Sequence, residues 1–306
     1  MAEQKKIDVV IPAYKPGEKF QKLIKMLQKQ TYPIHEILIM NTEKAYFPEA
    51  SVAGLPNVRV EHLTRAEFDH GGTRDKAAGL LSGDFFLFMT QDAVPADTYL
   101  VEKLAGAFDD KKVDAAYARQ LPNPDCSVIE RYTRSFNYPD APSVKTKKDL
   151  PKYGIKTFFC SNVCAMYRAE NYWRLGGFEK KTIFNEDMIY AGGLIQAGYG
   201  IAYAAEARVI HSHNYNCMQQ FHRNFDLGVS QAEHPEIFEG VPSEGEGMRL
   251  VKKTLAYLIH SGRIWLIPGF VLQCAGKYAG YLAGKNFRKL PKKFILWCTM
   301  SPNYWK

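Results

Sequence analysis

The feature that most constrains the fold of this 306-residue chain is an alternation of short apolar runs with amphipathic segments. Residues 7–14 (IDVVIPAY) form a β-branched apolar run, and residues 20–27 then carry apolar side chains at helical spacing. Further strand-like runs follow at 35–41, 58–63, 84–92, 113–118, 157–167 and 201–211. Helical patterns lie between them over 73–82, 97–108 and 185–197. The alternation predicts an α/β domain with a mostly parallel central sheet and flanking helices.

Two regions depart from this alternation. Residues 121–155 are rich in Pro, Asn, Asp, Tyr and Lys and show no clear period. An irregular stretch of this length in a compact domain is usually functional, and we expect it to help select a substrate. From about residue 247, helical apolar stretches alternate with Gly and Lys/Arg clusters. The sequence therefore predicts a main domain over residues 1–246 and a small, basic, amphipathic helical region over 247–306.

The net charge of +8 is distributed unevenly along the chain. Residues 249–306 contain eleven Lys or Arg and no acid, whereas the preceding residues hold 29 basic and all 32 acidic residues, a net of −3. Apolar side chains such as Trp265 and Phe270 lie among the tail cations, a mixture typical of helices at an anionic membrane surface. The alternative is that the tail helices pack on the main domain or on a second subunit. No nucleic-acid-binding motif accompanies the charge, so we expect no nucleic acid partner.

The residues at the carboxyl ends of the predicted strands are the candidates for ligand binding. Residues 12–14 close the first strand, Asn41 the second, and Thr90–Ala93 a fully apolar one. The acid pair Glu186–Asp187 opens a later predicted helix. Because ligands bind outside the carboxyl ends of parallel strands, we expect these residues to share one site.

Several motifs occur together in a characteristic order. They are the V-V-I-P-A-Y strand, the F-F-L-F-M run ending in T-Q-D-A, the G-G-F turn at 176–178 and N-E-D at 185–187. Their order resembles that of inverting GT-A glycosyltransferases of family 2 over roughly residues 5–235. The segment F-D-H-G-G-T-R at 68–74 is similar to the F-x-H-G-x-T-R segment of bacterial rhamnosyltransferases that use dTDP-L-rhamnose.

The resemblance implies an inverting enzyme with a GT-A fold. Such an enzyme would transfer L-rhamnose from dTDP-β-L-rhamnose to a hydroxyl of a lipid-linked cell-wall or capsular polysaccharide. Inverting transfer needs one base to take the proton of the attacking hydroxyl, and Asp187 matches the family's base, with Glu186 beside it in a structural role. The competing explanation is that acids are favoured in the first turn of any helix.

The resemblance also implies a divalent cation, Mg²⁺ or Mn²⁺, held by a D-x-D motif at the donor diphosphate. Thr90 replaces the first acid here, so Asp92 alone matches the motif, and the need for a metal stays open. In many GT-A enzymes a histidine at the end of a late strand adds a ligand, and His211 and His213 are the candidates. Turn capping by Asp92 and hydrogen-bonded structural histidines are the alternatives.

Donor binding is expected from residues that match the family's nucleotide and diphosphate contacts. Arg74 and Arg223 would neutralise the diphosphate, because guanidinium matches phosphate geometry. Asn41 stands where an acid is common. The full expected donor set is Pro12, Ala13, Tyr14, Asn41, Asp69, His70, Arg74, Gln91 and Arg223. The turn residues assigned to the acceptor side are Gly176, Gly177 and Phe178.

Other functions fit the same residues. One is the same fold with a UDP-hexose donor, and another is a non-catalytic membrane-bound scaffold, which the incomplete D-x-D motif suggests. For the preferred function we expect a cytoplasmic protein lying peripherally on the inner face of the bacterial plasma membrane. A homodimer remains open.

Overall fold

The computed structural model describes residues 4–241 and 244–306. In these residues nine strands form one sheet in the order β3-β2-β1-β4-β8-β6-β9-β5, and β7 pairs with β9. The strands are β1 (Ile7–Tyr14), β2 (Glu36–Thr42), β3 (Val58–Leu63), β4 (Phe85–Met89), β5 (Val94–Pro95), β6 (Val113–Leu121), β7 (Ser143–Lys145), β8 (Cys164–Arg168) and β9 (Gly200–Ile210).

The sheet is mixed rather than purely parallel. β3, β2, β1 and β4 run parallel, and so do β6 and β9. β8 lies between β4 and β6 and runs antiparallel to both. The start of β8 therefore meets the carboxyl ends of its neighbours, and the segment before Cys164 reaches the edge where ligands are expected.

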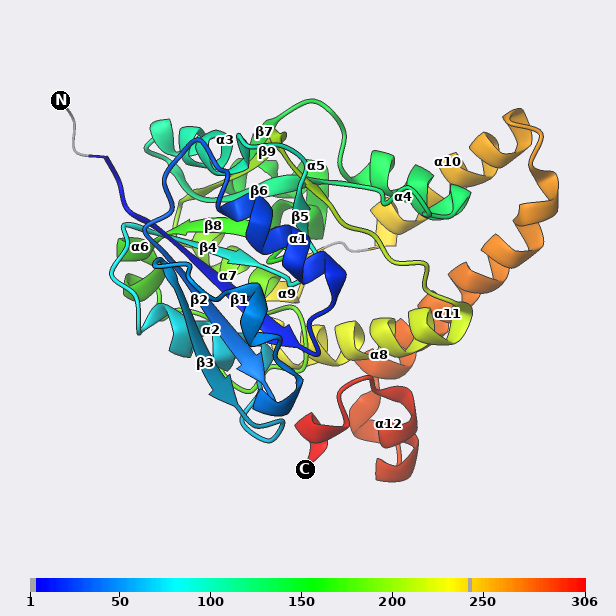
Figure 1. The fold of residues 1–306 in the computed structure, drawn as a ribbon. Coiled ribbons are helices and arrows are strands. Elements are labelled where there is room, and N and C mark those ends of the chain that lie inside the picture. The colour runs from blue at the N-terminus through cyan, green and yellow to red at the C-terminus, as the bar shows by residue number, and fades with distance from the viewer. Residues whose placement is uncertain (1–3, 242–243) are drawn as a thin grey trace.

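Helices cover both faces of the sheet (Figure 1). The helices of the described residues, on the sheet and beyond it, are α1 (Glu18–Leu27), α2 (His70–Ala78), α3 (Leu100–Gly106), α4 (Val128–Asn137), α5 (Leu150–Tyr153), α6 (Ala169–Arg174), α7 (Glu186–Gln196), α8 (Cys217–Glu233), α9 (Pro235–Phe238), α10 (Glu244–His260), α11 (Ile267–Lys285) and α12 (Lys292–Cys298). Alternate residues of β1 face opposite sides: Val9 and Ile11 pack with α1 and α3, whereas Val10 packs with α2 and α7.

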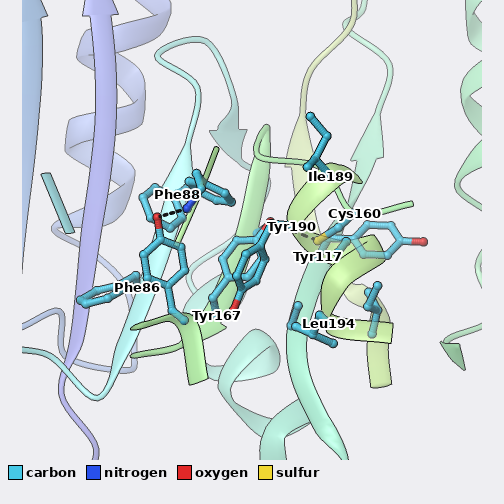
Figure 2. Packing of buried hydrophobic residues seen from close by; sticks show 14 of the residues in the cluster. Phe86, Phe88, Tyr117, Cys160, Tyr167, Ile189, Tyr190 and Leu194 are labelled. Carbon is cyan, nitrogen blue, oxygen red and sulfur yellow. Dashed lines mark hydrogen bonds between the residues drawn. The ribbon is translucent and has the colours of Figure 1, made fainter. Parts of the chain in front are cut away.

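One face of the sheet carries a dense aromatic core (Figure 2). The ring centroids of Phe88 and Tyr167 lie 5.7 Å apart, and those of Tyr167 and Tyr190 lie 5.5 Å apart, both edge-on. The Tyr167 hydroxyl donates to Asn162 Oδ1 over 2.9 Å. A buried aromatic ring thus fixes the residue that precedes β8 at the edge of the sheet.

Three sequence expectations need correction. The helix expected over 73–82 starts at His70, because the Asp69 carboxylate caps it by accepting from the Gly72 amide. The strand expected over 157–167 begins only at Cys164, since residues 154–158 form a 3₁₀ turn. The segment 121–155 is not irregular throughout, because it contains α4, whose N-cap Ser127 accepts from the Glu130 amide.

The C-terminal helices share a core with the rest of the chain. Phe225 and Val229 of α8 pack with Phe287 and with Ile295 of α12. The expected domain boundary after residue 246 falls in the first turn of α10. Figure 1 shows α10 and α11 as an arm that extends to one side of the sheet, with α11 returning along α8. Among the described residues, no helix is both long enough and apolar enough to cross a membrane.

Glycines allow α8 and α11 to pack without intervening side chains. A methyl group added at Gly284 would lie 2.1 Å from the Phe225 carbonyl oxygen. We expect Gly284→Ala to lower the free energy of unfolding by about 1–3 kcal/mol, because the helices must separate. Gly269→Ala in the same helix meets nothing within 4 Å. That control should be neutral or slightly stabilising. Equal urea midpoints for the two variants would contradict the packing argument.

Candidate active site

A pocket of about 740 Å³ opens where β4, β6 and β9 end and α7 begins. Residues far apart in the sequence line it together. The predicted site residues among them are His70, Arg74, Asp92, Glu186, Asp187, His211, His213 and Arg223. The structure therefore brings together both acids, the three expected metal ligands and the two arginines.

Asp92, His211 and His213 form a compact cluster. Asp92 follows β4, and the two histidines follow β9. His211 Nε2 lies 3.6 Å from Asp92 Oδ1, and His213 Nε2 lies 3.4 Å from Asp92 Oδ2. All three ligand atoms lie within 4.8 Å of one another. Within the described part of the chain, no other group of three or more such side chains meets this spacing.

Hydrogen bonds and burial keep this cluster ready to hold a cation. His211 Nδ1 donates to Gln120 Oε1 over 3.0 Å, and Arg134 donates to the same oxygen. His211 Nε2 therefore carries the lone pair, and it accepts from His213 Nε2 over 3.0 Å beside the Asp92 carboxylate. Burial lowers the pKa of His211 to about 3 and also lowers the pKa of His213, so both rings are neutral. One carboxylate and two neutral imidazoles fit a divalent transition metal.

Glu186 is a buried acid fixed by several partners. It lies 3.1 Å from the Arg74 guanidinium, and Asn162 Nδ2 donates to it over 3.1 Å. Burial alone would raise the pKa of Glu186, but the positive charge of Arg74 and the contribution of His70 outweigh burial and lower it. Arg74 also donates to the His70 carbonyl. Arg74 therefore neutralises Glu186, a role that the sequence did not predict.

Asp187 is held differently from its neighbour. Its Oδ2 accepts from the Asn162 amide over 3.0 Å, and its Oδ1 accepts from the Met188 amide over 2.8 Å. The side chain lies at the pocket wall and stays partly exposed. Burial and the negative charge of Glu186 raise the pKa of Asp187 to about 7. Of the two acids, Asp187 is the one that can exchange a proton near neutral pH.

Arg223 supplies a second cation to the pocket. It projects from α8, and its guanidinium lies 4.6 Å from the Phe184 ring centroid and 5.8 Å from that of Tyr215. Among the described residues, no carboxylate lies within ion-pair distance of Arg223. Its charge is thus available to an anionic ligand.

Six of the expected donor residues lie outside the pocket lining: Pro12, Ala13, Tyr14, Asn41, Asp69 and Gln91. The Gln91 side chain pairs with both backbone groups of Tyr14, each over 3.0 Å, and ties β1 to the end of β4. The Tyr14 ring lies edge-on to Tyr46. Asn41 is buried against His62, and Asp69 caps α2. Pro12 and Ala13 are residues of β1 itself.

The G-G-F turn also lies away from the pocket lining. Gly176 and Gly177 have φ angles of +91° and +71°, which residues other than glycine rarely adopt. Phe178 is buried in the aromatic core, and its amide donates to the Tyr172 hydroxyl. The structure thus places these three residues in a turn and in the aromatic core, outside the pocket lining.

Three site residues escaped prediction. Gln120 orients His211, Arg134 holds Gln120, and Asn162 bonds to both acids. The Ser127–Glu130 spacing, typical of a helix N-terminus, could have revealed α4 and with it Arg134. Asn162 carries no local signal, because its position depends on the antiparallel placement of β8.

Comparison with known sequences relates the chain to enzymes that transfer sugars. A sequence model described as glycosyl transferase family 2 matches residues 8–176. The O-antigen chain rhamnosyltransferase RfbN of Salmonella typhimurium (strain LT2) is 37% identical over 304 residues, which cover 98% of this chain and 96% of the relative. The O-antigen chain rhamnosyltransferase WbaN of Salmonella anatum is 38% identical over 302 residues, which cover 97% and 95%.

Solved structures share the architecture at low sequence identity. The mannosyltransferase PcManGT from Pyrobaculum calidifontis, solved with GDP-Man and Mn²⁺, gives a TM-score of 0.58 at 15% identity and covers 99% of this chain and 86% of that one. TarS of S. aureus gives a TM-score of 0.54 at 14% identity and covers 91% and 55%. These likenesses concern the fold alone, and they confirm the expected GT-A architecture.

Proposed function

The chain belongs to glycosyl transferase family 2, and from that premise we propose that this glycosyltransferase moves L-rhamnose from dTDP-β-L-rhamnose, with inversion, to a hydroxyl of a lipid-linked O-antigen-type polysaccharide. The observation that carries the choice of sugar is the 37–38% identity, over nearly the full chain, to two proteins named O-antigen chain rhamnosyltransferases. The F-D-H-G-G-T-R segment supports the same donor.

The acid pair supports an inverting mechanism. In such a reaction the acceptor oxygen forms a bond to C1 as the bond from C1 to the diphosphate oxygen breaks, and dTDP leaves. Asp187 takes the acceptor's proton, because its raised pKa matches a base that works near neutral pH. The amides of Asn162 and Met188 hold the Asp187 carboxylate in place. Glu186 stays ionised because it pairs with Arg74, and its negative charge raises the pKa of Asp187.

The Asp92–His211–His213 cluster supports a cation at the donor diphosphate. When bound there, a divalent cation supplies positive charge to the leaving diphosphate. Two imidazole ligands favour Mn²⁺ over Mg²⁺, which prefers oxygen ligands. Arg223, with no carboxylate partner among the described residues, adds a second positive charge to the same pocket.

The donor is tested with a panel of sugar nucleotides. We expect the purified full chain, given Mn²⁺, to release dTDP from dTDP-β-L-rhamnose faster than it releases UDP from UDP-glucose. Added EDTA should suppress that release, and NMR of a transfer product should show an α-L-rhamnoside. Turnover of UDP-glucose alone would reject the rhamnosyl donor in favour of the UDP-hexose alternative. Absence of turnover with every donor and membrane acceptor extract would favour the scaffold alternative.

The arm formed by α10 and α11 supports a peripheral membrane location on the cytoplasmic face, which we include in the proposal. Near its tip Ile259, Ile264 and Trp265 are 57%, 61% and 70% exposed, and Arg263 lies among them. Residues 249–306 carry only positive formal charges. Exposed apolar side chains flanked by cations complement the hydrocarbon boundary and the headgroups of an anionic bilayer.

Substitutions at the arm's tip should weaken membrane binding. We expect the double variant Ile264→Ser/Trp265→Ser to lower partitioning onto vesicles containing phosphatidylglycerol by about tenfold or more, because two large apolar side chains are lost from the interface. Leu80 and Tyr99 are also exposed but lie on the main domain. The matched variant Leu80→Ser/Tyr99→Ser should float like the wild type. Equal flotation of both variants would argue against an inserted tip, and self-association lost only in the first would indicate a contact between copies.

A further inference from the structure

A second cavity, of about 940 Å³, adjoins the active-site pocket. It lies among α4, α8, α10 and α11, and none of the residues assigned to proton transfer lines it. Its lining is largely apolar and includes Ile129, Leu227, Met248, Val251, Phe270 and Tyr278. Thr133, Phe159 and Tyr215 border both spaces, so the two are continuous neighbours. The catalytic mechanism gives this apolar space no role.

Three cations surround the Phe136 ring beside the two spaces. Lys156, Arg249 and Lys253 lie 4.9, 5.1 and 5.7 Å from the centroid of the Phe136 ring. Phe136 and Arg249 line the active-site pocket, and Lys156 lines both spaces. Lys253 is exposed and lies outside both linings, on the same helix as Arg249. We call Lys156, Arg249 and Lys253 the Phe136 cation cluster.

The Phe136 cation cluster keeps an excess of positive charge. Glu246 pairs with Lys156 and with Arg249, each over 2.9 Å. In the described part of the chain, no carboxylate lies within ion-pair distance of Lys253. Three like charges around one ring repel one another, and contact with the ring face offsets only part of that cost. A bound anion would remove the repulsion.

We propose that the Phe136 cation cluster binds the phosphate groups of a lipid-linked acceptor and that the acceptor's hydrocarbon chain lies in the second cavity. This inference rests on the proposed function and specifies its acceptor. The order of the parts matches: the sugar to be extended faces Asp187, phosphate meets the cations, and hydrocarbon meets the apolar lining. Cavities of roughly 300–1,000 Å³ enclose drug-sized ligands, so this one holds the phosphate-proximal part of a longer chain.

The cations of the cluster suit a phosphate in particular. Arg249 offers a planar fork of donors, and the two lysines add point charges. Arg249 and Lys253 are one helical turn apart on α10, so they face the same side. The proposed function assigns the donor diphosphate to Arg223 and to the cation that Asp92, His211 and His213 would hold. The Phe136 cation cluster is therefore left for a second phosphorylated ligand.

Three probes separate the two parts of the proposed site. Calorimetry on the full chain, in EDTA, compares farnesyl diphosphate with farnesol, which has the chain alone, and with inorganic diphosphate, which has the charge alone. We expect farnesyl diphosphate to bind the most tightly. The variant Arg249→Ala/Lys253→Ala should weaken its binding by about tenfold or more, the size of losing one or two charged contacts. Lys252→Ala, at an exposed neighbour on the same helix, should bind like the wild type.

A second variant tests the apolar part. Cys274 lines the cavity from α11, and Cys274→Phe should weaken binding of farnesyl diphosphate but leave inorganic diphosphate unchanged. Equal affinity for farnesyl diphosphate and inorganic diphosphate, or equal losses in the double variant and in Lys252→Ala, would overturn the proposal. Because binding is read without any sugar transfer, a failure of the donor panel leaves this result interpretable. Binding with no transfer would reject the proposed reaction and keep the lipid phosphate site.

Discussion

Replacing Asp187 by Asn should lower kcat about 10²–10⁴-fold while leaving the donor KM nearly unchanged, because the variant lacks the base that accepts the proton. The amide can still accept from the Asn162 or Met188 amide, so the local fold should persist. The measurement is steady-state dTDP release from dTDP-β-L-rhamnose with a membrane acceptor extract.

The matched control for this substitution is Asp84→Asn. Asp84 precedes β4 at the opposite end of that strand and bonds to the Lys6 amide and to Lys5. It should keep wild-type kcat, and both variants should melt cooperatively. Wild-type turnover by a folded Asp187→Asn variant would exclude Asp187 as the base.

The same carboxylate sets the expected pH dependence. The base must be unprotonated to act, and burial together with Glu186 raises the pKa of Asp187 to about 7. The value of kcat/KM should therefore rise with pH through that region and fall tenfold per unit of pH well below it. The residual activity of Asp187→Asn should not show this fall of kcat/KM at low pH. A wild-type profile that stays flat down to pH 5 would contradict the assignment.

Loss of the cation site should have a comparably large effect. We expect EDTA to reduce activity to background and Mn²⁺ to restore it. Asp92→Ala should lower Mn²⁺ affinity and reduce kcat/KM by about 10²–10³-fold, the cost of losing one electrostatic stabiliser of the transition state. Mn²⁺ binding is measured directly from the loss of the free-ion electron paramagnetic resonance signal. Full activity in EDTA would remove the cation from the mechanism.

A variant that keeps all three proposed metal ligands tests the hydrogen bond between Gln120 and His211. Gln120→Leu removes the acceptor that orients His211 without removing a ligand. It should weaken Mn²⁺ binding by about 10–100-fold, as other losses of ligand support do. An excess of Mn²⁺ should then restore turnover, whereas excess Mn²⁺ should rescue Asp92→Ala poorly. Unchanged Mn²⁺ affinity in Gln120→Leu would mean that the hydrogen bond does not orient the ring.

The parts of the fold that follow from local pattern could be predicted. The apolar run at residues 7–14 is β1, and the helix expected at 185–197 is α7 within one residue at each end. The histidines at the end of the last long strand and the aspartate after β4 come together because both strands end at the same edge of the sheet. The order of the strands along the chain, and the rule that parallel strands end at the same edge of a sheet, were sufficient to predict these features.

The rest depended on contacts between distant residues. Nothing local to Asn162 reveals that β8 runs antiparallel, yet that direction places it against both acids. Arg74 matched a motif, but the structure pairs its guanidinium with Glu186 in the pocket wall. Gly176 and Gly177 were recognisable as a turn, whereas the burial of Phe178 is a property of the aromatic core. The motifs therefore identified residues of the site more reliably than they identified which residues contact each other there.

The glycine contact between α8 and α11 has a mechanical consequence. Methyl groups at Gly228, Gly280 or Gly284 would each lie within 2.4 Å of a backbone oxygen of the facing helix. The two helix backbones are therefore in direct contact where α8 and α11 pack. Since α8 also bears Arg223, any displacement of the arm must carry the pocket wall with it. With its tip on a bilayer as proposed, the arm would hold the active-site pocket at a fixed distance from the membrane surface. Each helical turn inserted or removed there would change that distance by about 5.4 Å.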